Sequence, residues 1–444
     1  MIQLTGWGRY PRHESEWAEA STPGAVPTLM AEHSGLVARG NGRAYGDAAI
    51  GERITLSTGR LDRFRAFDAA TGRLTVEAGV LLADVLAAFV PRGFFPPVVP
   101  GTKLVTVGGM IAADVHGKNH HRDGGFGAHV EELKLVVPAG QTLTCSPAEK
   151  AELFAATIGG MGLTGTIVEA TFRLKPIETG WIRQRTLVAG DLDAAMAALQ
   201  ETAGATYSVA WIDCLARGAS LGRSLIYAAE HATREDVAAL RPGAELFPVS
   251  RPGRLSVPLE MPAGLLNRAS VKAFNELYFR RGAMRAGDPF LVHWEPYFFP
   301  LDGIADWNRI YGRRGFVQYQ CVIPPAAARH ALGEIIERVS RRGNASFLAV
   351  LKQLGASTGL VSFPTEGFTL ALDLPVTEDV FTLLDELDGV VVGAGGRLYL
   401  AKDSRQSPAT FEAGYPGLAA FRDLRRAIGA EGRIASRLSS RLAI

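Results

Sequence analysis

Glycine is concentrated in one stretch, residues 98–127, whose composition is typical of a ligand-binding segment rather than of a packed core. Its glycines are Gly101, Gly108, Gly109, Gly117, Gly124, Gly125 and Gly127. Short apolar runs and the polar run HGKNHH at 116–121 lie between them. Glycine this dense, with little charge nearby, allows the backbone to approach a large, flat ligand with its N–H groups free to donate.

The histidines of the polar run make metal binding an alternative. The spacing of His116 and His120 is a ligand spacing on a helix, and His121 follows directly. Gly117 and Asn119 disfavour a helix there, and no carboxylate or cysteine stands among the histidines. We therefore expect loop histidines that pack on a cofactor, and no metal.

Two more glycine-rich loops lie at 40–47 and 159–165. Residues 160–165 match G-x-G-x-x-G, but a dinucleotide fingerprint has a strand before it and a helix after it. Here a predicted helix precedes and a predicted strand follows. The 40–47 loop has the preceding strand without the helix, and its N–H groups could still form an anion nest. Taken singly, each loop is better explained as a plain glycine turn.

The combination is more informative than any single loop. All three loops adjoin predicted strands and lie in one N-terminal block. A nucleotide with a pyrophosphate, a ribityl chain and a three-ring head requires several such close approaches of backbone. We therefore hypothesise a flavin dinucleotide site in an oxidase.

The elements that must position these loops are short. Period-two and apolar patterns predict strands at 36–38, 53–56, 73–78, 133–137 and 167–174. Helices are predicted at 81–90 and at 148–157, the latter with Ser146 as its cap. Many short strands with few helices indicate an α+β arrangement up to about residue 180.

The pattern changes after residue 179. Helices are predicted within 187–202 and at 326–342, strands at 347–351 and 369–374, and an arginine-rich helical tail at 411–442. We expect a two-domain α+β protein, because 444 residues exceed one compact core. The predicted division is 1–180 with 397–444 for FAD, and 181–396 for substrate on an antiparallel sheet with helices.

Two segments of the second domain stand out. Residues 242–263 are rich in proline and lack periodicity, which predicts a long surface loop, and we expect a mobile lid around 242–285. Aromatic residues crowd 290–319. They fit either a simple core or a cleft for sugar and lipid.

Composition excludes several classes of protein. The formal net charge is +2 and no basic run with interleaved aromatics occurs, so we expect no nucleic-acid partner. The three cysteines are far apart and odd in number, which favours reduced thiols. The N-terminal residues carry charge and proline where a signal peptide has an apolar segment, and no apolar run approaches the ~20 residues of a membrane span.

The glycine motifs resemble those of flavin-linked oxidases of the vanillyl-alcohol-oxidase type. The family pattern is a glycine loop, then P-G-T…T-V-G-G-x-I-A…H-G, then G-G-x-G-x-x-G. The matching segments are ARGNGRAYGD at 38–47, PGTKLVTVGGMIAADVHGKNHH at 100–121 and GGMGLTG at 159–165.

Further segments are similar to one subfamily, the decaprenylphosphoryl-β-D-ribose 2′-oxidases. They are HGKNHH, WNRIYGRRGFVQYQ at 307–320, SFLAVLKQLG at 346–355 and GGRLYLAKDSR at 395–405. The resemblance covers nearly the whole chain and is loosest in the expected lid.

The resemblance implies a set of site residues. Those expected to bind FAD are Gly40, Asn41, Gly42, Arg43, Ala44, Tyr45, Gly46, Asp47, Pro100, Gly101, Thr102, Thr106, Val107, Gly108, Gly109, Ala112, His116, Gly117, Asn119, Gly160, Gly162, Leu163, Thr164, Gly165, Ile167, Tyr399 and Lys402. Those expected to bind substrate are Lys118, Phe298, Gln318, Gln320, Lys352 and Asp373. Lys402, His116 and Tyr45 are the implied catalytic residues.

Lysine suits the implied chemistry. Hydride leaves the 2′ carbon as the hydroxyl proton leaves, which requires a proton acceptor and a positive group near the flavin N1/O2 edge. Lys402 is the first choice, the alternative being a solvated lysine paired with Asp403. Lys118 and Lys352 are interpreted as phosphate or ribose binders. Gln318 and Gln320 alternate on a strand and so face one side, either as amide clamps or as an exposed strand face.

Some positions depart from the family pattern. Arg43 stands where many of these oxidases carry a histidine bonded to the flavin, so we expect non-covalent FAD. Ala371 replaces the cysteine of mycobacterial members, Thr369 an asparagine, and Phe298 a tyrosine. These changes concern substrate selectivity and remove the thiol that nitroaromatic inhibitors attack.

The expected function is oxidation of the ribose 2′-hydroxyl of a polyprenylphosphoryl-β-D-ribose to a ketone, in arabinan and cell-wall synthesis. A short-chain reductase is the expected partner, and the expected location is cytoplasmic with peripheral membrane contact. The alternatives are an oxidase of a free alditol or aldonolactone and, from another class, a flavin- or sugar-binding module without turnover.

Overall fold

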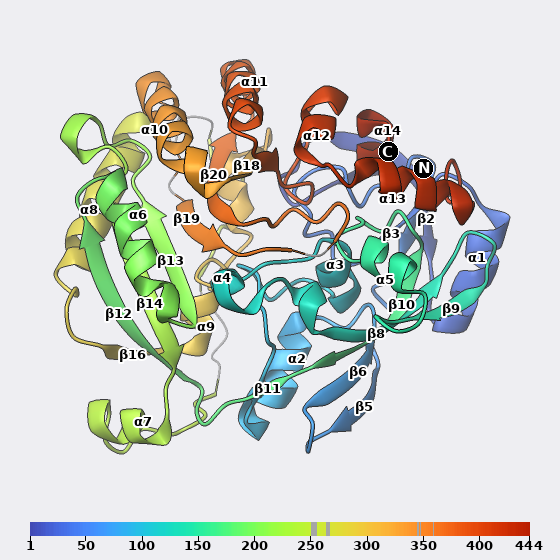
Figure 1. The fold of residues 1–444 in the computed structure, drawn as a ribbon, viewed down its shortest axis with the longest axis horizontal. Coiled ribbons are helices and arrows are strands. Elements are labelled where there is room, and N and C mark those ends of the chain that lie inside the picture. The colour runs from blue at the N-terminus through green and yellow to red at the C-terminus, as the bar shows by residue number, and fades with distance from the viewer. Residues whose placement is uncertain (250–254, 263–266, 344–345, 347, 358) are drawn as a thin grey trace.

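The computed structural model describes residues 1–249, 255–262, 267–343, 346, 348–357 and 359–444. Three larger sheets with helices around them form the molecule (Figure 1). Its segregated helices and largely antiparallel sheets confirm the predicted α+β class. Among the described residues, no helix is both long enough and apolar enough to cross a bilayer.

The first sheet carries the 40–47 loop. It contains, in spatial order, β1 (Ile2–Thr5), β2 (Arg12–Glu19), β4 (Ile54–Ser57) and β3 (Leu36–Arg39). Strands β2 and β3 both run parallel to β4, which is buried along its whole length. Helix α1 (Val26–Glu32) connects β2 to β3, and residues 40–53 connect the parallel pair β3 and β4. The first glycine loop therefore starts where β3 ends.

The second sheet is antiparallel and carries the other two glycine loops. Its order is β5 (Phe64–Asp68), β6 (Arg73–Glu77), β10 (Thr166–Arg173), β8 (Val130–Val136) and β9 (Thr142–Cys145). The helices beside it are α2 (Leu82–Phe89) and α5 (Ala151–Thr157). The short strands β7 (Phe94–Phe95) and β11 (Lys175–Pro176) pair with each other. The third glycine loop connects α5 to β10.

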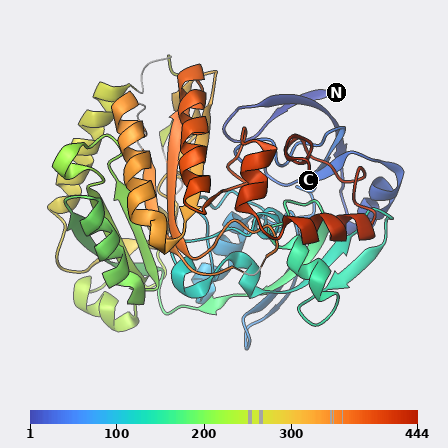
Figure 2. The same cartoon turned by 45° about the horizontal axis from the view of Figure 1, so that its top comes forward.

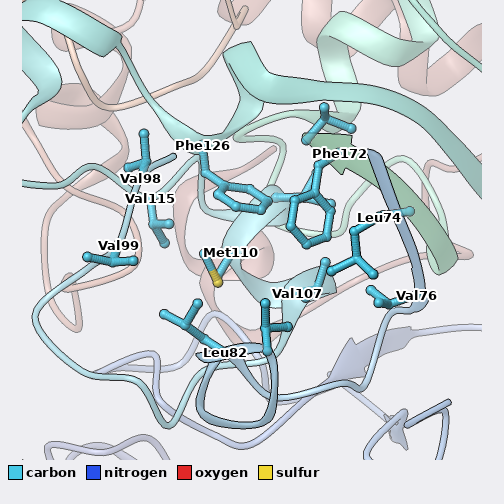
Figure 3. Close-up of a cluster of buried hydrophobic side chains, with 14 of the residues drawn as sticks. Leu74, Val76, Leu82, Val98, Val99, Val107, Met110, Val115, Phe126 and Phe172 are labelled. Carbon is cyan, nitrogen blue, oxygen red and sulfur yellow. The ribbon is translucent and has the colours of Figure 1, made fainter. Parts of the chain in front are cut away.

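The central glycine stretch folds onto a hydrophobic core (Figure 3). Its apolar residues form α3 (Val107–Ala112), whose cap Thr106 accepts a hydrogen bond from the Gly109 N–H. Met110 is fully buried, and the nearby rings of Phe126 and Phe172 have centroids 5.1 Å apart. A second short helix, α4 (His120–Asp123), begins only after Asn119. Burial of one face of α3 thus leaves its glycine side available to a ligand.

The third sheet has eight strands. Their order is β16 (Phe290–His293), β12 (Trp181–Ala189), β14 (Ser224–His231), β13 (Tyr207–Ile212), β19 (Ala349–Leu354), β20 (Gly367–Pro375), β18 (Phe316–Ile323) and β21 (Arg397–Leu398). One face packs on α6 (Leu192–Glu201), α10 (Pro325–Arg342) and α11 (Glu378–Gly393) (Figures 1 and 2). The alternate side chains of the central strands therefore point to the other face.

Further elements surround this sheet. They are α7 (Arg234–Leu240), α8 (Arg268–Ala283), α9 (Trp294–Phe298) and the parallel pair β15 (Leu255–Ser256) and β17 (Ile304–Ala305). The lid prediction falls partly on 250–254 and 263–266, which lie outside the described residues. The helix predicted within 187–202 is confirmed as α6, with Asp191 as its cap, while residues 187–189 still pair with β14.

The C-terminal helices return to the N-terminal strands (Figure 2). They are α12 (Pro408–Gly414), α13 (Leu418–Ala427) and α14 (Arg437–Leu442). Isolated bridges join Leu36 to Ile434 and Gly51 to Ser436. The assignment of 397–444 to an FAD domain stays a prediction. In the structure, β21 still belongs to the eight-stranded sheet, and the helices after it pack against the first sheet.

Candidate active site

A cavity of about 600 Å³ lies between the glycine loops and the eight-stranded sheet. Most of the residues predicted from the sequence line it. They are Gly40, Asn41, Gly42, Arg43, Ala44, Tyr45, Pro100, Gly101, Thr102, Thr106, Gly108, Gly109, Ala112, His116, Gly117, Lys118, Gly162, Gly165, Ile167, Phe298, Gln318, Gln320, Lys352, Tyr399 and Lys402.

Eight predicted residues lie behind this lining. Val107, Leu163 and Thr164 are buried in the core, and Gly160 packs against the carbonyl of Ala156. Asn119 donates to the Pro97 carbonyl and to Asp123. The remaining three are Gly46, Asp47 and Asp373. Such residues support the wall of the cavity rather than forming its surface.

The glycine wall is held by close packing between loops. A Cβ on Gly40 would lie 2.2 Å from Thr106 Oγ1, so the first loop and the start of α3 touch. Asn41 Nδ2 donates to the Leu104 carbonyl at 2.7 Å. Gly101 differs, since a Cβ there would meet nothing within 4 Å. Its freedom lies on the cavity side, where a ligand can approach the backbone.

Lys402 projects from a tight turn after β21. Its backbone N–H and that of Asp403 both donate to the Tyr399 carbonyl at 2.9 Å. The Lys402 ammonium nitrogen lies 3.7 Å from the ring centroid of Tyr45, whose N–H donates to the Ala401 carbonyl. Burial lowers the pKa of Lys402 to about 7, although Asp373 opposes this shift. Lys402 is therefore balanced between its neutral and cationic forms near neutrality.

Asp373 and Gln318 face each other across β20 and β18. Gln318 Nε2 donates to Asp373 Oδ1 at 2.5 Å, and Asp373 Oδ2 has no hydrogen-bond partner among the described residues. Burial raises the pKa of Asp373, while the Gln318 hydrogen bond and Lys402 oppose that change. A buried carboxyl and a buried amine with pKa values displaced toward each other can exchange a proton at little cost.

His116 lies deep in the cavity between the sheet and the glycine stretch. Its Nε2 is 2.9 Å from Gln320 Nε2, which also donates to Thr369 Oγ1. Burial and the charge of Lys352 hold the His116 pKa well below its ordinary value, so the ring is neutral. Its Nδ1 is buried without a partner in the described part of the chain. Such a nitrogen is available to a ligand.

Two further lysines reach the same cavity. Lys118 donates to the Tyr297 carbonyl and lies 4.0 Å from the Tyr297 ring centroid. Burial lowers the pKa of Lys118 to about 7 and that of Lys352 to about 8. With Lys402, three cationic side chains from three distant segments converge on one cavity, which suits an anionic substrate.

The predicted histidine run does not gather on one point. His120 Nδ1 accepts from the Gly355 N–H, and His121 Nε2 lies 3.0 Å from the Ala205 carbonyl. No group of three metal-ligating side chains occurs among the described residues. The histidines join the central stretch to neighbouring segments.

Sequence reasoning did not identify the aromatic and acidic residues that complete the cavity. Trp211 and Tyr227 enter it from β13 and β14, and Tyr278 from α8, its ring 4.8 Å from that of Trp211. Asp302 accepts from the Lys103 N–H at 2.7 Å. Trp7 packs under Arg43, whose guanidinium carbon is 3.9 Å from the ring centroid. Only alternation with buried neighbours on β13 and β14 could have indicated the first two.

The aromatic residues at 290–319 contribute both to the core and to the wall of the cavity. Phe316, Tyr311 and Trp307 pack on one another in the core, with the Tyr311 and Phe316 rings stacked at 4.5 Å. Trp307 and Phe298 also line the cavity. One aromatic cluster therefore belongs to the core and also lines the cavity.

Comparison with known proteins gives the cofactor. Residues 25–146 match the family described as FAD binding domain. A glycine wall with open space at Gly101, and an Arg43 Nε that has no hydrogen-bond partner among the described residues, fit the phosphates and ribityl chain of FAD. The chain is therefore an FAD-dependent oxidoreductase.

Full-length similarity defines the family more closely. The chain is 36% identical to the decaprenylphosphoryl-β-D-ribose oxidase of Mycolicibacterium smegmatis over 99% of this chain and 97% of that protein. It is 32% identical to cytokinin dehydrogenase 9 of Oryza sativa over 38% of this chain and 34% of that protein. It is 29% identical to L-gulonolactone oxidase of Bos taurus over 31% of each. The chain belongs to the decaprenylphosphoryl-β-D-ribose oxidase family.

Proposed function

We propose that this protein oxidises the 2′-hydroxyl of a polyprenylphosphoryl-β-D-ribose to the 2′-keto sugar. The observation that carries the proposal is the convergence of Lys118, Lys352 and Lys402 on one cavity beside the glycine wall. An uncharged alditol or lactone would not require three buried lysines, whose charged forms are costly to desolvate without an anion.

Each face of the cavity has a proposed role. The glycine loops would hold the pyrophosphate and ribityl chain of FAD, with Arg43 and Asn41 at their surface. Bound FAD would supply the hydride acceptor. Arg43 occupies the position of the flavin-linking histidine in related oxidases, so the proposed attachment is non-covalent.

Lys402 is the proposed proton acceptor. In its neutral form the amine takes the proton of the 2′-hydroxyl as the C2′–H bond breaks and hydride leaves. The resulting ammonium would then supply a positive charge beside bound FAD. Tyr45 and His116 orient the reacting sugar, and Asp373 receives the proton from Lys402 for release.

The remaining polar groups would bind the substrate. Gln318 and Gln320 lie on one face of β18 and would clamp the ribose hydroxyls. Lys118 and Lys352 would pair with the phosphate, and the aromatic side chains at the cavity wall would cover the first part of the lipid.

The chemistry of the product indicates what surrounds this reaction. A 2′-keto sugar that is reduced from the opposite face gives the arabinose epimer, so we propose a short-chain reductase as partner. A cytoplasmic enzyme in peripheral contact with a membrane would meet a lipid-linked substrate.

Anaerobic mixing of the FAD-loaded protein with farnesylphosphoryl-ribose tests the proposal. The visible flavin band should bleach, and the 2′-keto product should be found by mass spectrometry. Bleaching by free alditols or aldonolactones, with none by the phosphoryl-ribose, would overturn the substrate assignment. A protein that takes up FAD and is bleached by none of these would indicate a binding module.

A further inference from the structure

Arg441 on α14 pairs with two buried carboxylates from two different loops. Its Nε and Nη2 lie 3.1 and 2.9 Å from the two carboxylate oxygens of Asp47, a bidentate arrangement. Its Nη2 is also 2.9 Å from Asp403 Oδ2, and Nη1 donates to the Gln406 carbonyl at 2.8 Å. One guanidinium therefore joins the end of the first glycine loop to the turn after Lys402.

Both loops hold parts of the site. Asp47 comes two residues after Tyr45, and Asp403 directly follows Lys402. The loops are in close contact, since a Cβ on Gly46 would lie 1.9 Å from the Asp403 carbonyl oxygen. Asp403 Oδ1 also accepts from the N–H groups of Arg405 and Gln406 at 2.9 Å, which shapes the turn. Displacement of either carboxylate would change the contact between Lys402 and Tyr45.

The positive charge of Arg441 also compensates the two buried carboxylates. The side chains of Asp47 and Asp403 are only 3% and 4% exposed, so their charges are compensated by protein rather than by water. Burial disfavours the Asp403 carboxylate, yet Arg441 and the two backbone N–H groups hold its pKa below the ordinary value. Without the guanidinium, an unpaired carboxylate would adjoin the Lys402 residue.

We propose that Arg441 is a positioning residue for the reaction: by pairing with Asp47 and Asp403 it fixes the Lys402 side chain over the Tyr45 ring and neutralises the carboxylate beside it. The other charged or titratable groups that face Lys402 are Asp373, Lys352, His116 and Tyr45. The inference rests on the role proposed above for Lys402 beside the flavin.

Sulfite tests this inference without substrate. Sulfite adds to oxidised flavin and bleaches its visible band, and a positive charge at the N1/O2 edge favours the addition. Sulfite affinity is measured against pH in the FAD-loaded wild type, Lys402→Met, Arg441→Gln, Arg441→Lys and the double variant Arg441→Gln with Asp403→Asn. Arg422→Gln is the matched control, because Arg422 on α13 binds the Ala443 carbonyl and Glu412 instead.

In the wild type, affinity should fall with rising pH as Lys402 loses its proton, and Lys402→Met should remove this dependence. Arg441→Gln should raise the pH at which sulfite affinity is half lost by about one unit, because the unpaired Asp403 carboxylate stabilises the Lys402 ammonium. This pH is called the midpoint. The double variant should have the wild-type midpoint but a sulfite affinity different from that of the wild type. The midpoint of Arg441→Lys should lie between those of Arg441→Gln and the wild type.

The proposal would be overturned if Arg441→Gln bound sulfite with the same affinity and the same pH midpoint as the wild type. It would also be overturned if Arg422→Gln changed both quantities as much as Arg441→Gln does. If Arg441→Gln takes up no FAD, the test rests on the double variant and Arg441→Lys. A wild-type midpoint and a wild-type sulfite affinity in both of these variants would overturn the proposal. A Lys402→Met protein whose sulfite affinity keeps the wild-type pH dependence would instead contradict the placement of Lys402 at the flavin. Failure of the substrate assignment leaves every sulfite result unaffected.

Discussion

The Lys402 ammonium nitrogen lies 3.7 Å from the ring centroid of Tyr45, so the turn after β21 meets the first glycine loop at a cation–π contact. The contact favours the charged lysine, whereas burial favours the neutral one. Catalysis by this residue would use both forms, first as an acceptor of a proton and then as a positive charge.

The rate of flavin reduction should rise with pH through about 7. Burial lowers the pKa of Lys402 to about 7, and only the neutral amine accepts a proton, so its active fraction grows as pH increases past that value. Anaerobic stopped-flow at saturating substrate, over about two pH units on each side of neutrality, measures this. A rate that falls with rising pH in that range would contradict the assignment of Lys402 as base.

Lys402→Met should retain FAD but lose flavin reduction by a factor on the order of 10²–10⁴, the usual contribution of a general base. The methionine keeps most of the side-chain volume while removing the amine. Lys150→Met is the control, since Lys150 is exposed and pairs with its neighbour Glu149, outside the cavity. Visible absorbance measures retained FAD, and single-turnover mixing measures reduction. Normal reduction in Lys402→Met would assign the base elsewhere.

Gly46→Ala and Gly101→Ala should separate folding from cofactor binding. A Cβ at Gly46 would lie 1.9 Å from the Asp403 carbonyl oxygen, whereas one at Gly101 meets nothing within 4 Å. Gly46→Ala should lower the melting temperature of the FAD-free protein by about 1–3 °C, since forced backbone displacement costs about 1–3 kcal/mol. Gly101→Ala should leave that temperature unchanged and weaken FAD binding.

Thermal unfolding of both proteins with and without FAD, together with FAD titration, supplies the comparison. Equal FAD affinity in Gly101→Ala and wild type would show that the cofactor does not pack against this part of the wall.

Ala371→Cys should introduce a reactive thiol into a cavity that has none among the described residues. The three native cysteines are buried, and burial raises the pKa values of the Cys214 and Cys321 thiols to about 12. Ala371 lines the cavity on β20, directly opposite Gln320. Mass spectrometry after iodoacetamide treatment should find one adduct in the variant and none in the folded wild type. Bound substrate should protect the new thiol.

Strands and helices with a strong local pattern were predictable. Predicted strands at 36–38, 73–78 and 167–174 correspond to β3, β6 and β10, and the helix predicted at 326–342 is α10. The first and last residues of these elements were harder to predict. Ser146 accepts from the N–H groups of Ala148 and Glu149 in a turn, so α5 begins only at Ala151. A capping residue fixes a turn locally, but tertiary packing decides where the helix starts.

The glycine wall could be anticipated because close backbone approach requires glycine itself. The convergence of Gln318, Lys352 and Lys402 followed from resemblance, since no local pattern relates residues on three separate strands and turns. Trp211, Tyr227 and Tyr278 were missed for the same reason. Their positions depend on the pairing order of the eight-stranded sheet and on how α8 packs against it.

Arg441 lies near the C-terminal end of the sequence, yet it binds Asp47 beside the first glycine loop. During synthesis, therefore, the N-terminal sheets can form while this clamp is still absent. The cofactor site becomes complete only when α14 has left the ribosome and packed against the first strands. We expect nascent chains that stop before α14 to bind FAD weakly, because the first glycine loop then lacks the partner of Asp47.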